Sequence, residues 1–300
     1  MDHCTIATRA MRASAAAMLV VVLTAGGGQA IAAGPPQLRP PHGFTEIDEG
    51  PAGGTVWQGV IPNRVRPSLR RLSLVYLPSA ASSGARYPVM YLLHGFRGGP
   101  YSFVFGLRFA DYADEAIASH AVPPFIAVMP VAGPKGYDGE WAGPWEQYLI
   151  RDVVPWTDRQ LPTLADRRDR AIAGLSAGGY GAVDIGLRHP HTFGTMESWS
   201  GYFEPIRDGP LRTASAADLA AHDPTLLVPR EDRLLRRLGT RFFLSCGSTR
   251  DRGNLPHTLS FGRLLASFHV SHRVWLGPGD HDGAFWRSQL PAAIDYAMRG

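Results

Sequence analysis

Apolar runs of strand length recur along the chain from residue 70 onward, each bounded by turn-forming residues. Most of these runs are apolar throughout rather than alternating between apolar and polar positions. They occupy residues 70–78, 88–95, 125–133, 169–176, 194–201, 241–248 and 271–279. A strand that is apolar on both faces is typical of a parallel sheet covered on both sides, so the runs predict such a sheet.

Helical patterns lie between most of these runs. In residues 145–160, Trp145, Leu149 and Trp156 share one face at helical spacing, while charged residues such as Arg151 occupy the other. Similar patterns occupy residues 109–120, 180–189, 259–268 and 289–298. The alternation of strands and helices predicts an α/β fold, in which a mostly parallel central sheet lies between two layers of helices as a three-layer sandwich.

The N-terminal segment, residues 1–33, has the pattern of a secretory signal peptide. Arg9 and Arg12 precede an apolar stretch from Ala15 to Ala25, and small residues suited to cleavage follow it. The apolar stretch is shorter than a membrane span requires. We therefore expect a secreted or cell-envelope protein with no stable membrane insertion after cleavage, a retained anchor being the alternative.

The rest of the chain is expected to form one domain. Residues 34–44 are rich in proline and glycine and predict an extended linker, so the folded domain is expected over residues 45–300. Within it, residues 202–238 interrupt the alternation with short helical pieces and loops. This interruption predicts an insertion or lid over one edge of the sheet.

The composition excludes several classes of protein. With 45% hydrophobic and 19% charged residues, the 300-residue chain can form one large core. The formal net charge is +4, but the basic residues are scattered, so no nucleic-acid partner is expected. Cys4 would leave with the signal peptide, and a disulfide framework is then excluded because Cys246 has no cysteine partner. Cys246 is expected to be a small buried strand residue.

One apolar run ends in a serine flanked by glycines. Gly174, Ser176 and Gly178 match the G-x-S-x-G nucleophile elbow, a strained strand-to-helix turn that projects the serine Oγ into a cleft. Glycines are needed there because Cβ atoms would collide across so tight a turn. The N–H groups at the start of the following helix favour an oxyanion beside the serine. The alternative is a glycine-rich turn that packs the helix on the sheet, which would not require a serine.

A nucleophilic serine also requires oxyanion donors. The sequence HGFRGG follows a predicted strand that ends at Leu93, and it resembles the oxyanion loop of esterases and lipases. We predict that the backbone N–H groups of Phe96 and Ala177 are the two donors. His94 is expected to orient this loop rather than to act directly in catalysis.

The general base and its acid partner are expected near the C-terminus, because α/β-hydrolase triads run serine, acid, histidine along the chain. His281 follows the last predicted strand and is the predicted base. Asp251 follows the penultimate strand, 30 residues before His281 (281 − 251), and is the predicted acid; a surface pair with a nearby arginine is the alternative. Asp280 and Asp282 adjoin the histidine and are poorly placed as partners. Solvated or capping roles are expected for His189, His191, His257, His269 and His272.

Aromatic residues just after a strand end are candidates for a substrate pocket. Trp199 and Tyr202 occupy such positions and are predicted to bind substrate, because aromatic faces suit phenolic and carbohydrate groups. Core packing is the alternative for both residues. Trp286 follows His281 on the last predicted helix and is expected to pack beneath it.

Five ordered motifs together resemble the putative-esterase family of α/β-hydrolases, over about residues 65–300. They occupy residues 87–99, 129–133, 145–161, 171–201 and 281–290. The family includes feruloyl and acetyl-xylan-type esterases, S-formylglutathione hydrolases, enterochelin esterases and mycolyltransferases. The resemblance implies an α/β-hydrolase fold and a triad carried here on Ser176, Asp251 and His281, with the Phe96 and Ala177 amides as oxyanion donors.

The resemblance implies a serine esterase that hydrolyses small-molecule or carbohydrate esters through an acyl-enzyme on Ser176. Asp251 is the least secure residue of the triad, because the acid position varies within the family. The mycolyltransferases carry aspartate where this chain has His94, and export argues against the glutathione-linked members. The alternatives are an acyltransferase of mycolyltransferase type and a non-catalytic envelope- or carbohydrate-binding protein. No cofactor or metal is expected, since no H-E-x-x-H motif occurs.

Overall fold

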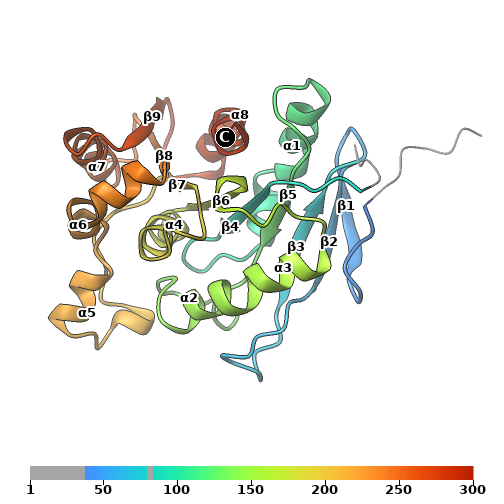
Figure 1. Ribbon diagram of the computed structural model, residues 1–300, viewed down its shortest axis with the longest axis horizontal. Coiled ribbons are helices and arrows are strands. Elements are labelled where there is room, and N and C mark those ends of the chain that lie inside the picture. Colours follow the sequence, from blue (N-terminus) through green and yellow to red (C-terminus); the bar gives the residue numbers. More distant parts are fainter. Residues whose placement is uncertain (1–37, 80–83, 300) are drawn as a thin grey trace, which may run out of the picture. The chain divides into compact units, whose positions relative to one another are not determined.

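A nine-stranded sheet forms the centre of the computed structural model, which describes residues 38–79 and 84–299 (Figure 1). The strand order is β1-β2-β3-β5-β4-β6-β7-β8-β9. The strands are β1 (Thr45–Glu49), β2 (Thr55–Val60), β3 (Leu72–Leu77), β4 (Val89–Leu93), β5 (Ile126–Met129), β6 (Arg170–Leu175), β7 (Thr195–Trp199), β8 (Arg241–Gly247) and β9 (Ser271–Gly277).

The strands from β5 to β9 in this order run parallel, and β1, β2 and β3 form an antiparallel edge. The pairing aligns the C-terminal residues of neighbouring strands: Leu93 lies opposite Gly174, Leu175 opposite Trp199, and Trp199 opposite Ser245. Because the carboxyl ends of parallel strands share one edge of the sheet, the loops after β4, β6, β7 and β8 emerge side by side.

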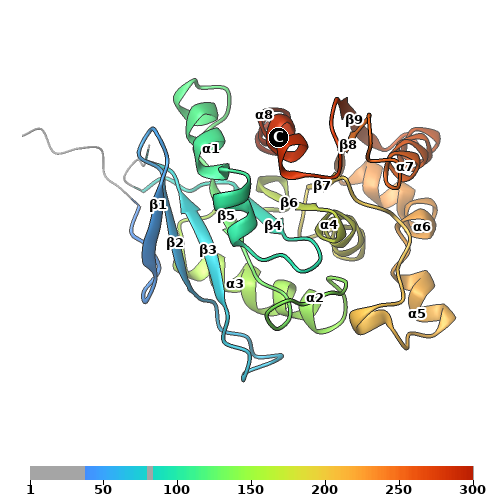
Figure 2. The same ribbon diagram turned by 180° about the vertical axis from the view of Figure 1, so that it is seen from behind.

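Helices cover both faces of the sheet, and Figures 1 and 2 show α1 and α8 on the side opposite α2 and α3. The core contacts place α1 and α8 on one face and α2, α3, α4, α6 and α7 on the other. The helices are α1 (Phe109–Ala118), α2 (Pro144–Tyr148), α3 (Val154–Gln160), α4 (Ala177–Arg188), α5 (Ala216–Ala221), α6 (Pro224–Arg237), α7 (Leu255–Ser267) and α8 (Gly283–Met298).

Residues of the central strands are buried on both faces. In β4, Tyr91 and Leu93 pack under the α4 layer, while Met90 and Leu92 pack under α1 and α8, and all four are fully buried. Continuous apolar runs are therefore needed here, as the sequence pattern predicts. The predicted fold class, a three-layer α/β-hydrolase fold, is confirmed.

Two predictions near the N-terminus need correction. The strands β1 and β2 were not among the predicted runs, because β1 at the edge of the sheet and β2 beside it are only partly buried and lack a continuous apolar run. The described part of the predicted linker is packed rather than free: Leu38 and Phe44 contact the core, and Phe44 stacks on Trp156 with ring centroids 5.3 Å apart. The expected signal peptide and residues 34–37 lie outside the described residues.

The predicted insertion is shorter than residues 202–238. Its second half forms α6, the crossover helix between β7 and β8, which packs beside α4 and α7 and buries Val228 and Leu235 completely. The extra segment is therefore limited to residues 202–223, which contain α5. The crossover helix α6 was missed in the sequence because its outer face is charged and because it contains Pro229. Among the described helices, none is both long and apolar enough to span a bilayer.

We predict that Phe44→Ala lowers the free energy of unfolding by about 1–3 kcal/mol, because the half-buried ring leaves a cavity beside Trp156. Urea unfolding monitored by tryptophan fluorescence measures this change. Phe105→Ala is the matched control, since Phe105 is 63% exposed. Equal stability of the two variants would contradict the packed position of Phe44.

Candidate active site

Ser176 occupies a strained turn between β6 and α4. Its backbone has φ 57° and ψ −122°, a conformation that L-residues adopt rarely and at a cost. The turn is held by hydrogen bonds, because the Ser176 N–H donates to the Trp199 carbonyl at 2.8 Å and the Ser176 carbonyl accepts from Gly179 at 2.8 Å and from Tyr180 at 3.1 Å. The serine therefore stands at the N-terminus of α4, at the carboxyl edge of the sheet.

The two glycines of the elbow are required by the end of β4 as well as by the turn itself. A Cβ atom on Gly178 would lie 2.0 Å from the carbonyl oxygen of Leu93. One on Gly174 would lie 2.2 Å from the carbonyl oxygen of Gly178 and 2.7 Å from that of Leu93. The absence of side chains thus lets the elbow approach the loop that follows β4.

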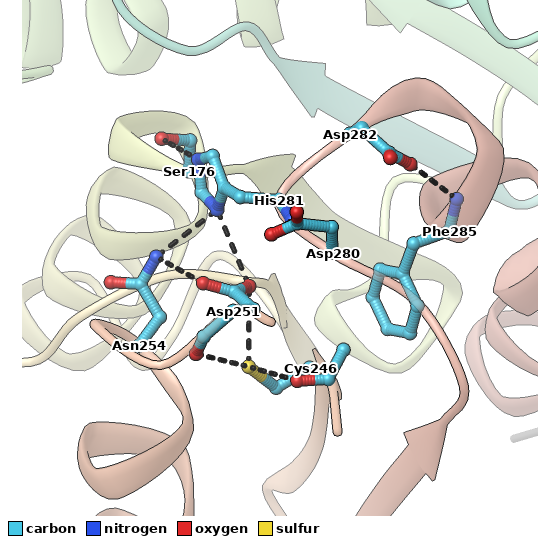
Figure 3. Close-up of polar contacts among 9 residues, drawn as sticks. Ser176, Cys246, Asp251, Asn254, Asp280, His281, Asp282 and Phe285 are labelled. Carbon is cyan, nitrogen blue, oxygen red and sulfur yellow. Dashed lines mark hydrogen bonds and ion pairs between the residues drawn. The ribbon is translucent and has the colours of Figure 1, made fainter. Parts of the chain in front are cut away.

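The structure brings Ser176, His281 and Asp251 into one line (Figure 3). Ser176 Oγ and His281 Nε2 are 2.9 Å apart, and His281 Nδ1 lies 3.3 Å from Asp251 Oδ2. Trp286 packs against His281 edge-to-face, with ring centroids 5.0 Å apart. The three polar side chains come from the loops after β6, β8 and β9, which explains how residues far apart in the sequence meet. Asp280 instead accepts the backbone N–H of His281, and Asp282 caps α8.

Asp251 is a buried carboxylate surrounded by donors. Burial alone raises the pKa of Asp251, but hydrogen bonds from His281 and Cys246 outweigh that effect and hold the pKa below its usual range. Cys246 Sγ lies 3.3 Å from Asp251 Oδ2. Burial, with the adjacent carboxylate, raises the pKa of Cys246 to about 12, so it remains a thiol and donates to Asp251. The alternative of a surface pair with arginine does not fit this buried position.

Asn254 also touches this group, although the sequence analysis did not single it out. Its amide Nδ2 donates to Asp251 Oδ1 at 3.1 Å and lies 3.1 Å from His281 Nδ1 (Figure 3). The residue is the N-cap of α7, but its side chain does not cap the helix. The sequence signal that could have identified Asn254 was its position, three residues after the predicted acid and just before a helix that begins with Leu-Pro.

The loop after β4 lies directly against Ser176. A Cβ atom on Gly95 would lie 3.1 Å from Ser176 Cβ and 3.1 Å from the Leu175 carbonyl oxygen, which is tighter than an ordinary van der Waals contact. Among the described residues, no hydrogen-bond acceptor engages the backbone N–H of Phe96 or Ala177. Two amide donors on neighbouring segments beside Ser176 could therefore receive a negatively charged oxygen.

His94 holds this loop in place. Its Nδ1–H donates to the Gly95 carbonyl at 2.9 Å, and its Nε2 accepts the Ala132 N–H at 3.1 Å. Burial lowers the pKa of His94 to about 4, so the ring is neutral and can both donate and accept. Trp141 Nε1 donates to the His94 carbonyl at 2.9 Å. These contacts match an orienting role.

The prediction that Trp199 binds substrate is corrected by its position. Its side chain is fully buried, packs edge-to-face against Phe103 and donates to Glu197 at 3.0 Å, so it belongs to the core. Strand alternation turns this side chain toward α1 and α8. Tyr202, by contrast, lies in a small cluster with the aromatic Phe96 and Tyr180 and with Ala177, beside the predicted oxyanion donors.

A buried glutamate supports Tyr202 and was missed by the sequence analysis. Glu140 has no exposed surface, and the Tyr202 hydroxyl donates to its Oε1 at 2.5 Å. The Tyr202 ring stacks on Tyr180 with centroids 5.2 Å apart. Burial raises the pKa of Glu140 to about 9, so the carboxyl is neutral at neutral pH. The short sequence GEWAG around Glu140 carries no pattern that predicts burial.

Among the described residues, no group of three or more His, Cys, Asp or Glu side chains is placed to hold a metal ion. The chemistry that the described geometry can perform is proton transfer between Ser176 and His281, with Asp251 stabilising the charged imidazole. The backbone amides beside Ser176 can stabilise an oxyanion. These are the requirements of acyl transfer through a serine nucleophile.

A family model matches most of the chain. The family model described as "Putative esterase" matches residues 70–296. Esterase Rv1288 of Mycobacterium tuberculosis is 34% identical over 133 residues, which cover 42% of this chain and 28% of that protein. The chain therefore spans less than a third of the length of this relative.

Two further matches cover more of the chain. The diacylglycerol acyltransferase/mycolyltransferase Ag85B of Mycolicibacterium smegmatis is 25% identical over 246 residues, which cover 68% of this chain and 70% of that protein. A solved ferulic acid esterase superposes with a TM-score of 0.72 and 24% sequence identity, covering 82% of this chain and 98% of that one. The structural match shows the shared fold.

We predict that Gly178→Ala destabilises the protein by about 2–3 kcal/mol, because its Cβ would collide with the backbone of Leu93. Thermal and urea unfolding measure the change. The matched control is Gly99→Ala, whose Cβ would meet no atom within 4 Å. It is expected to change stability by less than about 0.5 kcal/mol. If Gly178→Ala were as stable as this control, the close approach of the elbow to β4 would be wrong.

We predict that Glu140→Gln stabilises the protein more at pH 8 than at pH 5. The pKa of Glu140 is raised from 4.5 to about 9 in the folded state, so folding takes up a proton between these values. The free energy of unfolding of the wild type therefore falls as the pH rises from 4.5 toward about 9. The glutamine side chain of the variant does not titrate, so the variant does not lose this stability. Urea midpoints at both pH values test the prediction, with Glu115→Gln as an exposed control. A gain independent of pH would contradict a neutral Glu140.

Proposed function

The chain belongs to the Putative esterase family, and on this premise we propose that it is a serine esterase that hydrolyses carboxylic esters through an acyl-enzyme on Ser176. The observation that carries the proposal is the 2.9 Å contact between Ser176 Oγ and His281 Nε2. A nucleophile and a base at hydrogen-bond distance, with an acid behind the base, is the arrangement that activates a serine.

In the first half of the reaction, His281 takes the proton of Ser176 as Oγ attacks the ester carbonyl. Asp251 stabilises the resulting imidazolium, and its lowered pKa keeps it ionised for this role. The Phe96 and Ala177 amides stabilise the oxyanion of the tetrahedral intermediate. Collapse of that intermediate expels the alcohol, which takes its proton from His281, and leaves the acyl group on Ser176.

In the second half, His281 removes a proton from water as the water attacks the acyl-enzyme. The free acid then leaves, and Ser176 regains its proton. If an alcohol replaced the water, the same groups would transfer the acyl chain. The 25% identity to a mycolyltransferase makes this acyl transfer the second candidate function. A purely binding role is disfavoured, because it would require neither the strained serine nor the aligned histidine.

The proposed substrate is a small-molecule or carbohydrate ester, and the proposed location is outside the cytoplasm. The proposed location rests on the N-terminal sequence, in which Arg9 and Arg12 precede a short apolar stretch and small residues. An enzyme that leaves the cell without a disulfide must depend on its core, and the described core covers both faces of the sheet.

We predict that Ser176→Ala lowers kcat for a short p-nitrophenyl ester at least about 10³-fold, because the acyl-enzyme cannot form. Ester hydrolysis and labelling by a fluorophosphonate probe are the measurements, and the exposed Ser119→Ala serves as the control. If the folded wild type neither hydrolyses such esters nor reacts with the probe, the proposal fails. Acyl transfer to an added alcohol in preference to water would favour the acyltransferase.

A further inference from the structure

Asn254 touches both partners of the candidate acid–base pair through one atom. Its amide nitrogen Nδ2 lies 3.1 Å from Asp251 Oδ1 and 3.1 Å from His281 Nδ1 (Figure 3). The acid and the base are farther from each other, since His281 Nδ1 and Asp251 Oδ2 are 3.3 Å apart. Hydrogen bonds with a charged partner usually measure about 2.7–2.9 Å, so the contact between Asp251 and His281 is long. The amide is thus closer to each partner than the two are to each other.

A short turn fixes Asn254 in this position. Its backbone N–H donates to the Asp251 carbonyl at 3.2 Å, and the Leu255 N–H donates to the same carbonyl at 2.9 Å. The Asn254 carbonyl in turn accepts the Thr258 N–H at 2.9 Å at the start of α7. The amide is therefore held by the backbone on the Asp251 side of the His281 ring.

The contact between Asn254 and His281 joins two hydrogen-bond donors in the reactive state. An amide nitrogen carries N–H groups and accepts no hydrogen bond. For His281 to take the Ser176 proton on Nε2, its own proton must lie on Nδ1, which donates it to Asp251. The 3.1 Å contact then places the positive end of the amide dipole beside a ring nitrogen that already carries hydrogen.

Two effects of this amide act in the same direction. The ring becomes positively charged when His281 takes the Ser176 proton, and the neighbouring amide dipole opposes that charge. The hydrogen bond from Asn254 to Asp251 Oδ1 also stabilises the carboxylate by itself, which weakens its attraction for the charged ring. Both effects favour the neutral form of His281. Asn254 is half-buried, so water screens only part of this interaction.

Other charged and titratable side chains surround this pair and stay in place when Asn254 is replaced. Among the described residues, none of them forms an ion pair with Asp251 or His281. They are Cys246 from β8, Arg250 and Arg252 beside Asp251, His257 one turn farther along α7, Asp280 and Asp282 beside His281, and Arg287 from α8. Variants of Asn254 therefore isolate the contribution of the amide.

We infer that Asn254 is a positioning residue that acts through Asp251 and His281 and lowers the pH at which the base becomes available for the reaction. The effect on the rate rests on the proposed esterase function. Because neutral His281 is the form that accepts the Ser176 proton, the amide extends the active range toward acidic pH.

The test measures kcat/KM for phenyl acetate against pH and locates the acidic pH at which it is half-maximal. Asn254→Leu keeps the side-chain size without the N–H groups, and Asn254→Ala removes them with a smaller side chain. We expect each to raise the half-maximal pH by about 0.5–1 unit, and Asn254→Asp, which adds a negative charge, to raise it further. A merely structural role would lower stability and the rate but leave the half-maximal pH in place.

Thr249→Val is the matched control. It removes the 3.3 Å hydrogen bond from the Gly279 N–H to Thr249 Oγ1, which joins the same two loops without touching Asp251 or His281. We expect it to move the half-maximal pH by less than about 0.2 unit.

Three results would overturn the inference. The first is a half-maximal pH in Asn254→Leu and Asn254→Ala that equals or lies below that of the wild type. The second is a shift in Asn254→Asp no larger than in Asn254→Leu, because the electrostatic argument then fails. The third is an equal shift in Thr249→Val, which would assign the effect to the placement of the loops.

Failure of the proposed function is distinguishable from failure of this inference. If the function fails, no ester is hydrolysed in a manner lost in Ser176→Ala. The NMR signal of the His281 C2–H, assigned by comparison with His281→Ala, still titrates without turnover. Its midpoint should rise from the wild type to Asn254→Leu and again to Asn254→Asp, and an unchanged midpoint would overturn the inference by itself.

Discussion

The candidate site depends on the close approach of the β6–α4 elbow to the end of β4. Only because Gly174 and Gly178 lack side chains can their backbone lie against the Leu93 carbonyl. This contact sets the loop after β4 beside Ser176, where Gly95 makes a second close approach: a Cβ atom there would lie 3.1 Å from Ser176 Cβ. The position of the serine beside both candidate oxyanion donors thus follows from close backbone packing that the glycines allow.

Around this contact the protein treats two buried carboxyl groups in opposite ways. Asp251 receives hydrogen bonds from His281, Cys246 and Asn254, and these donors offset the loss of water, so it stays ionised. Glu140 is buried with a single donor, the Tyr202 hydroxyl, and its raised pKa leaves it neutral. The ionised Asp251 can stabilise an imidazolium on the neighbouring His281. The neutral Glu140 can position the Tyr202 ring without placing a negative charge beside a developing oxyanion.

The sequence analysis succeeded where a physical requirement acts locally. Continuous apolar runs predicted strands that are buried on both faces, and the G-x-S-x-G motif predicted a turn that requires glycines. It failed where several distant segments decide the outcome. Trp199 is an aromatic residue at a strand end, which is typical of a pocket residue, but strand alternation directs its side chain into the core. Residues 224–238 resembled part of an insertion because α6 carries a charged outer face around a few deeply buried positions. Glu140 has no local signature, and the local signal for Asn254 is limited to its place three residues after Asp251.

The sequence by itself determined the fold class and the elbow, because periodicity and glycine placement depend on neighbours within a few positions. The candidate positions Asp251 and His281 followed instead from the order of serine, acid and histidine along α/β-hydrolase chains. The tertiary structure alone decided which polar groups meet: that Asp251 is buried against Cys246, that Asn254 contacts Asp251 and His281, and that Glu140 lies behind Tyr202. Such contacts depend on how loops from separate strands pack at one edge of the sheet. That packing is a sum of many long-range interactions, and no short stretch of sequence encodes it.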